Sequence, residues 1–166
     1  MNFFCGKCKG KLKQIESGLI CPCRESSYEF KNSVYITNKK DVLDTDFVGK
    51  NAEQMDGVWT YAKECDEIGR TVECALGHLD ETILSGVAID MGCGTGHYVK
   101  ELAKRFSSLL AVDTCSDFLL YFAAKAAPLP DNVTLIADSG SSLPLAQGSI
   151  SLIFSAAFWP FKPMLE

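Results

Sequence analysis

This sequence of 166 residues has no long hydrophobic run and no recognisable leader. No apolar stretch reaches the ~18 residues that a membrane-spanning helix needs. Near its start the chain has a cysteine-rich segment rather than the basic and apolar segments of a secretory signal. Internal repeats and low-complexity tracts are missing as well. We therefore expect a cytoplasmic globular protein that does not enter a membrane.

A large charge of either sign is also missing, since the net charge is −5. Residues 1–50 hold nine Lys and Arg against six Asp and Glu, whereas the rest of the chain holds seven against fifteen. The mildly basic N-terminal part could contact an anionic partner, but so small an excess of positive charge does not by itself indicate nucleic-acid binding. With 47% hydrophobic and 22% charged residues, the composition is that of an ordinary globular protein.

Cysteine, by contrast, is plentiful, and four of the eight cysteines lie close together near the start. Cys5 and Cys8 form a C-x2-C pair, and Cys21 and Cys23 form a C-x-C pair twelve residues later. In a reducing cytosol, clustered cysteines are more often metal ligands than disulfides, and four thiolates suit tetrahedral Zn2+. We predict a zinc-ribbon-like module in residues 1–37, in which the metal supplies folding free energy. The alternative is four reduced cysteines without a metal, because the second pair is one residue shorter than usual.

The rest of the chain divides into a linker region, residues 38–84, and a region of alternating strands and helices, residues 85–166. This alternation predicts an α/β fold with a Rossmann-like, doubly wound and mostly parallel sheet of about four strands. The predicted strands cover 33–37, 87–90, 109–113, 133–138 and 150–155, the first of them in the cysteine module. The predicted helices cover 52–68, 71–84, 97–106 and 117–127.

A glycine-rich loop follows the strand at 87–90, with the sequence Asp90-Met-Gly92-Cys-Gly94-Thr-Gly96. Glycines allow a sharp turn and a close approach of the backbone to a ligand. Dinucleotide-binding enzymes use G-x-G-x-x-G at this point, whereas here the pattern is D-x-G-x-G-x-G. An acid beside the loop would repel a pyrophosphate, but it suits the cationic amino group of a methionine moiety.

Acidic residues also end the next two predicted strands. Asp113 follows Gly94 by nineteen residues and could accept both hydroxyls of a ribose. Asp138 is placed to accept the amino group of an adenine, and the Ser139 amide could donate to a ring nitrogen. Each acid alone could be a solvated strand end or a helix cap. Three acids at the carboxyl ends of successive strands indicate a ligand site, because α/β proteins bind ligands there.

Residues 87–155 resemble the class I S-adenosylmethionine-dependent methyltransferases. The stretch from Asp90 to Gly96 is similar to their first motif, Asp113 to their ribose-binding acid and Asp138 to their adenine-binding acid. The layout of the whole chain also resembles the bacterial 23S rRNA guanine-N1 methyltransferases, although their fourth zinc ligand is generally a histidine. The resemblance implies S-adenosyl-L-methionine as the cofactor, with these binding residues: Asp90, Gly92, Cys93, Gly94, Thr95, Gly96, Tyr98, Asp113, Thr114, Asp138, Ser139 and Ser155.

The resemblance also implies an enzyme that transfers a methyl group to an RNA base or a small-molecule acceptor. Transfer from a sulfonium needs chiefly alignment of donor and nucleophile, so no catalytic residue is assigned. His97, Tyr98 and residues 158–161 could line the acceptor side, and ordinary packing is the alternative for each. The second interpretation is a non-catalytic, truncated methyltransferase-like protein that acts as a binding or partner module.

The fourth predicted strand ends near Ser155, where class I methyltransferase sheets continue with further strands. We therefore expect an exposed sheet edge, which favours pairing with another chain. The expected consequences are self-association or completion by a C-terminal segment, and little activity from these residues alone.

Overall fold

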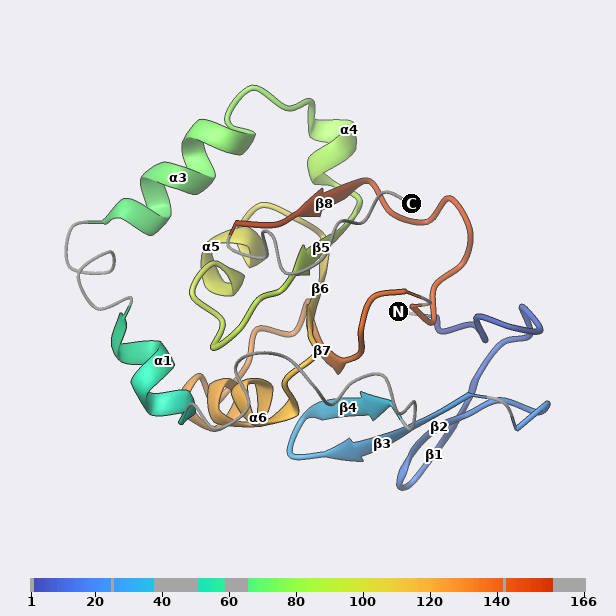
Figure 1. Cartoon of the computed structure of the whole chain (residues 1–166). Coiled ribbons are helices and arrows are strands. Elements are labelled where there is room, and N and C mark those ends of the chain that lie inside the picture. Colours follow the sequence, from blue (N-terminus) through green and yellow to red (C-terminus); the bar gives the residue numbers. More distant parts are fainter. Residues whose placement is uncertain (1, 25, 38–50, 59–65, 142, 157–166) are drawn as a thin grey trace, which may run out of the picture.

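The computed structural model describes residues 2–24, 26–37, 51–58, 66–141 and 143–156, and its main feature is one mixed sheet of eight strands (Figure 1). Their order across the sheet is β1-β2-β3-β4-β7-β6-β5-β8. The strands are β1 (Lys13–Ile15), β2 (Gly18–Ile20), β3 (Ser27–Lys31), β4 (Val34–Thr37), β5 (Val87–Met91), β6 (Ser108–Asp113), β7 (Val133–Ala137) and β8 (Leu152–Phe154). The helices are α1 (Ala52–Val58), α3 (Glu67–Leu76), α4 (Glu81–Leu84), α5 (Val99–Ala103) and α6 (Ser116–Lys125).

The centre of the sheet is formed by β5, β6 and β7, whose sequences are nearly uninterrupted apolar runs. Such runs are typical of parallel strands that are buried on both faces. Helix α5 connects β5 to β6, helix α6 connects β6 to β7, and both strand pairs are parallel. The next strand, β8, pairs with the opposite side of β5. The chain therefore changes direction across the sheet beside β5, and the carboxyl end of such a switch point is where α/β sheets bind ligands.

The other half of the sheet is an antiparallel meander of β1 to β4, joined to the centre by the parallel pair of β4 and β7. The sheet therefore has eight strands, and the prediction of about four is wrong. Strands β1 and β2 have only three residues each, and β1 is exposed throughout. So short a strand shows no alternation of apolar and polar residues that the sequence could reveal. The three-part division of the chain at residues 37 and 84 stays a prediction.

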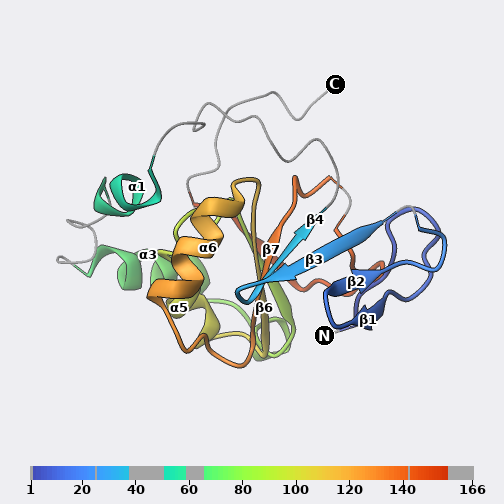
Figure 2. The same ribbon diagram turned by 90° about the horizontal axis from the view of Figure 1, so that it is seen from below.

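The two faces of the sheet are covered by different parts of the chain (Figure 2). Helices α3, α5 and α6 contribute Val72, Leu102 and Leu119 to the core on one face. The cysteine module covers the other face, where Cys5 and Cys21 belong to one buried cluster with residues of the central strands. In a doubly wound fold, helices would cover that face too. Among the described residues the link from β7 to β8 contains no helix, and its sequence at 139–151 is rich in glycine and serine.

The helix boundaries differ from the predicted ones in the linker region. The single helix predicted at 71–84 is two helices, because α3 begins at Glu67 and a turn after Leu76 separates it from α4. Of the helix predicted at 52–68, α1 covers the first seven residues, and residues 59–65 lie outside the described residues. Within the described ranges, no helix combines the length and hydrophobicity needed to cross a membrane.

Candidate functional site

The glycine loop after β5 turns the chain from the sheet into α5, and three of its glycines have left-handed backbone conformations. The φ angles are 74° at Gly92, 55° at Gly94 and 80° at Gly96. A Cβ atom added at Gly94 would meet no atom within 4 Å, whereas one added at Gly96 would lie 2.4 Å from the Phe122 ring. The loop is therefore packed against the helix layer at Gly96 and open at Gly94.

Asp113 ties this loop to the end of β6. Its Oδ2 accepts the Gly94 N–H at 2.8 Å, and its Oδ1 accepts the Cys115 N–H at 2.8 Å. Burial raises the pKa of Asp113, and the hydrogen bonds from Cys115 and Gly94 partly offset that effect. Each carboxylate oxygen has a second lone pair, so the side chain can still accept the ribose hydroxyls that the sequence predicted for it.

Asp90 lies one strand away, in β5, and is almost fully buried with 2% of its surface exposed. Its Oδ2 atom is buried and has no hydrogen-bond partner. Burial, reinforced by the nearby charge of Asp113, raises the pKa of Asp90 to about 7. A buried carboxylate oxygen without a donor is unstable. A ligand with a cationic amino group would supply both the missing donor and a counter-charge, and this donor requirement fits the predicted cofactor.

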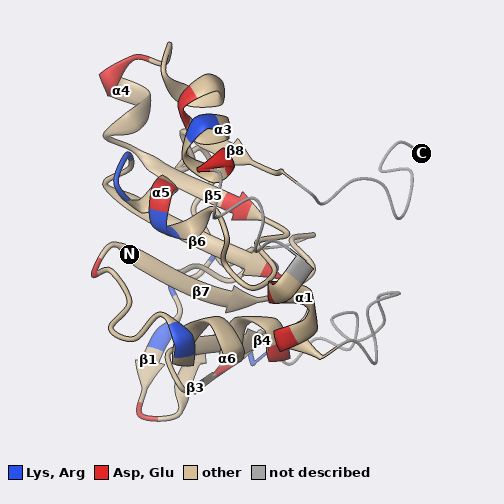
Figure 3. Cartoon of the chain, turned by 90° about the vertical axis from the view of Figure 1, so that its left-hand side faces the viewer, with Lys and Arg blue, Asp and Glu red and all other residues tan. Residues whose placement is uncertain are grey.

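Asp138 follows β7 and is also buried, with 1% of its surface exposed. Its Oδ2 accepts the hydroxyl of Tyr28 at 3.0 Å, and its Oδ1 accepts the Gly140 N–H at 3.0 Å. Tyr28 belongs to the cysteine module, and no sequence pattern links it to a residue 110 positions away. Acidic positions thus gather where the arrows of β5, β6 and β7 end, near α1 (Figure 3).

The other predicted cofactor residues lie around these three acids. Ser155 follows β8 and donates its hydroxyl to the Met91 carbonyl at 3.1 Å, so it holds the ends of β5 and β8 together. Tyr98 packs on Phe154 of β8, with ring centroids 5.3 Å apart. Cys93 and Thr95 are buried in the loop, while Thr114 and Ser139 are half-buried beside the acids. Residues 158–161 lie outside the described residues.

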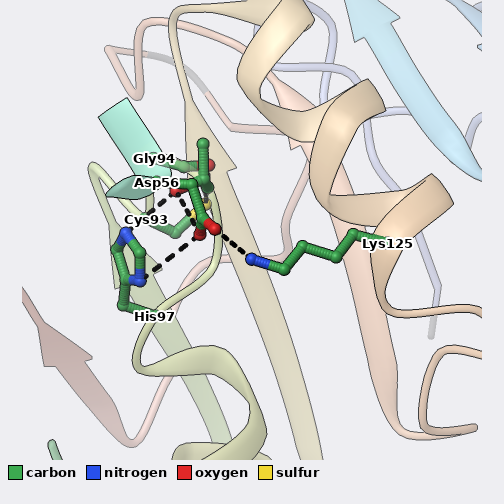
Figure 4. A network of polar contacts seen from close by, with 6 residues as sticks. Asp56, Cys93, Gly94, His97 and Lys125 are labelled. Atoms are coloured by element: carbon green, nitrogen blue, oxygen red, sulfur yellow. Dashed lines mark hydrogen bonds and ion pairs between the residues drawn. The ribbon is translucent and has the colours of Figure 1, made fainter. Parts of the chain in front are cut away.

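A second polar group lies on the helix side of the loop (Figure 4), and two of its members, Asp56 and Lys125, were not predicted from the sequence. Asp56 of α1 forms an ion pair with Lys125 of α6 and accepts a hydrogen bond from the Thr95 hydroxyl at 3.4 Å. His97 lies 3.8 Å from Asp56, and its Nε2 is 2.9 Å from the Thr95 hydroxyl. Asp56 is buried in α1 beside half-buried and exposed residues, and no sequence pattern marked it.

A cavity of about 350 Å3 adjoins this group, between α3, α5 and α6. Thr95 is its one lining residue among the predicted cofactor residues. Because the three strand-end acids do not line it, we place the candidate site at the strand ends and not in this cavity.

The four clustered cysteines meet as predicted, with all four Sγ atoms within 4.8 Å of one another. The Sγ–Sγ distances are 3.7 Å for Cys5 and Cys23, 3.3 Å for Cys8 and Cys21, and 3.0 Å for Cys21 and Cys23. Four sulfurs at 2.3 Å from a zinc ion lie about 3.8 Å apart, so small outward shifts would complete the tetrahedron. The backbone amides of Cys8 and Cys23 each point at the first sulfur of their pair, at 3.4 Å. The donor set therefore fits Zn2+.

Zinc binding is tested by elemental analysis of the chain purified without a chelator. We expect about one zinc per chain, and loss of that zinc in the double variant Cys5→Ser/Cys8→Ser. Cys74→Ser is the matched control, because Cys74 is an exposed thiol on α3, away from the cluster. A folded wild-type chain without metal would contradict the prediction.

Comparison with known proteins shows what part of the chain is similar to methyltransferases. Residues 88–164 match the model of the family described as "Methyltransferase domain". A malonyl-[acyl-carrier protein] O-methyltransferase of Methylococcus capsulatus is 31% identical over 109 residues, which cover 64% of this chain and 38% of that protein.

One solved structure gives the same fold. The protein is described as an S-adenosyl-L-methionine-dependent methyltransferase from Methanococcus maripaludis. The TM-score is 0.56 and the sequence identity is 24%. The match covers 71% of this chain and 55% of that protein. The present chain thus spans about two fifths of the curated relative and about half of the solved structure.

Proposed function

We propose that the chain is a class I methyltransferase that binds S-adenosyl-L-methionine at the carboxyl ends of β5, β6 and β7 and transfers its methyl group, which the match of residues 88–164 to a methyltransferase domain supports. The observation that carries the proposal is the buried Oδ2 of Asp90, which has no donor and lies in the strand that leads into the glycine loop. A cationic amino group satisfies this atom, and a pyrophosphate does not. The neighbouring Asp113 and Asp138 add two further acceptors at the same sheet edge.

Each residue of the site has a separate binding role in this proposal. Asp90 accepts the amino group of the methionine part, Asp113 accepts the ribose hydroxyls, and Asp138 accepts the adenine amino group. Gly94 lets the backbone approach the ligand, since nothing else occupies the space next to it. When bound, the cofactor supplies an electrophilic methyl group on a sulfonium.

The acceptor is proposed to be an RNA base or a small molecule. In either case the protein must mainly align the acceptor with the methyl group, and alignment alone contributes several kcal/mol, roughly 7–11 at most. We therefore assign no general base. By its name the Methylococcus relative methylates an acyl-carrier-protein substrate, so a carrier-bound carboxylate belongs among the acceptors to be assayed.

Cofactor binding is tested by calorimetry with S-adenosylmethionine, its product S-adenosylhomocysteine and NAD. We expect the first two to bind in preference to NAD. Asp113→Ala should weaken their binding by roughly 1–3 kcal/mol, because hydroxyl donors lose a charged acceptor.

Asp117→Ala is the matched control for this substitution, since Asp117 is an exposed acid in the first turn of α6. Thermal melts of both variants separate lost binding from lost folding. Heat with NAD and none with either methionine compound would rule the proposal out.

A further inference from the structure

The hydroxyl of Tyr28 joins the cysteine module to the predicted adenine site. Tyr28 is 3% exposed, lies in β3, and donates to Oδ2 of Asp138 at 3.0 Å. Oδ1 of the same carboxylate accepts the Gly140 N–H at 3.0 Å. Each oxygen of Asp138 therefore accepts a hydrogen bond, and one of these donors comes from a segment 110 residues earlier in the chain.

The sheet itself holds Tyr28 in this position. Tyr28 is paired with Leu19 of β2 on one side and with Thr37 of β4 on the other. Strand β4 in turn pairs with β7 up to Ala137, the residue before Asp138. The tyrosine side chain therefore reaches across β4 to the end of β7, and rigid strands on both sides restrict its movement. Burial and the negative charge of Asp138 raise the pKa of Tyr28, so the hydroxyl keeps its proton and acts as the donor.

This arrangement dictates what a ligand next to Asp138 can offer. Both oxygens already act as acceptors, and the lone pairs that remain can be used only by another donor. A 6-aminopurine presents such a donor at its exocyclic nitrogen, whereas a 6-oxopurine presents an acceptor there. A carboxylate that was free to turn would distinguish the two less well, since it could move away from the repelling oxygen.

We propose that Tyr28 is a positioning residue that fixes Asp138 as an acceptor and so makes the site select adenine over 6-oxopurines. This inference rests on the proposed function, because it assumes that the adenine of the cofactor lies next to Asp138. It gives the meander of β1 to β4 a role in ligand selection besides completing the sheet.

The test compares S-adenosylhomocysteine with its 6-oxo analogue, S-inosylhomocysteine, by calorimetry on the full chain. We expect the wild type to prefer the adenine compound at least about tenfold, as sites that hydrogen-bond a specific group do. Tyr28→Phe should weaken binding of the adenine compound about tenfold and reduce the preference toward one. Tyr35→Phe is the matched control, because Tyr35 lies in β4 and packs on Phe3 and Phe30 instead of on Asp138.

Asp138→Ala separates this inference from the proposed function. If Asp138→Ala leaves binding of S-adenosylhomocysteine unchanged, the adenine assignment itself fails. If it weakens binding while Tyr28→Phe changes both compounds equally, Tyr28 has only a structural role and the inference is overturned. In the Asp138→Ala background, Tyr28→Phe should have no further effect on the preference.

A measurement on the wild-type sequence covers the case in which Tyr28→Phe does not fold. The chain is labelled with 3-fluorotyrosine, and the Tyr28 resonance is followed by fluorine NMR. It should move when S-adenosylhomocysteine is added, because the adenine amino group then shares the carboxylate of Asp138. An equal movement with S-inosylhomocysteine would overturn the inference.

Discussion

Gly96→Ala is expected to lower the free energy of unfolding by about 2–5 kcal/mol. Gly96 has a φ of 80°, which costs strain for any residue with a Cβ atom, and the new methyl group would lie 2.4–2.5 Å from ring carbons of Phe122. Phe122 is 3% exposed and belongs to the core cluster of the helix side, so displacing its ring would disturb that packing. Urea unfolding followed by circular dichroism measures the change.

Gly94→Ala is the matched control for this substitution. Gly94 also has a positive φ, 55°, but nothing lies within 4 Å of an added Cβ atom. We therefore expect only the conformational cost, about 1–2 kcal/mol, together with weaker cofactor binding, because the methyl group would enter the space beside the loop. Equal destabilisation by the two substitutions would show that contact with Phe122 is not the cause.

The central strands could be predicted from the sequence because their burial leaves a direct trace in it. Strands β5, β6 and β7 lie within one residue of the predicted ranges at each end. Each is a short, mostly apolar run with an acid within one residue of its carboxyl end, because most of its side chains are buried. The same pattern brought Asp90, Asp113 and Asp138 to one sheet edge.

Of the four strands of the meander, β4 alone matches a predicted strand, because β1 and β2 have three residues each and β3 is mostly exposed. The pairing that joins the meander to the centre connects segments distant in sequence, Val34 with Leu135. Residues of β3 such as Glu29 and Phe30 are exposed, and the strand is held by its pairing with β4, which itself depends on β7. Likewise, the bond from Tyr28 to Asp138 and the ion pair of Asp56 with Lys125 join elements that no local pattern relates. That sheet pairing and those side-chain contacts become visible only when the strands and helices are assembled.

The sequence predicted an exposed sheet edge, and the eight-stranded sheet still has one at β8. Strand β8 pairs only with β5 among the described residues, and Ile153 on it is 62% exposed. Self-association through this edge stays a prediction. The opposite edge of the sheet is β1.

Asp90→Asn is expected to stabilise the chain at pH 8 and to impair cofactor binding. The pKa of Asp90 is about 7 in the folded protein and about 3.9 in an unfolded chain. The stability that comes from the protonated form is therefore complete below about pH 4 and is lost as the pH rises through 7, by roughly 4 kcal/mol in all. An asparagine removes this loss but buries an amide, which costs about 1–3 kcal/mol. Urea unfolding at pH 8 should show a net gain of about 2 kcal/mol, and the gain should vanish near pH 4.

The same carboxylate makes cofactor binding depend on pH in the wild type. A cationic amino group requires Asp90 to be ionised, so binding below pH 7 must release the proton that burial retains there. The affinity for S-adenosylhomocysteine should rise by up to about tenfold per pH unit between pH 5 and 7 and then level off.

Calorimetry in buffers of different ionisation enthalpy should detect release of about one proton at pH 6. Asp90→Asn should show weaker binding without this proton release. If Asp90→Asn is less stable than the wild type at pH 8, or still releases the proton, another group carries the charge. Asp113 is then the first candidate, because its charge acts on Asp90.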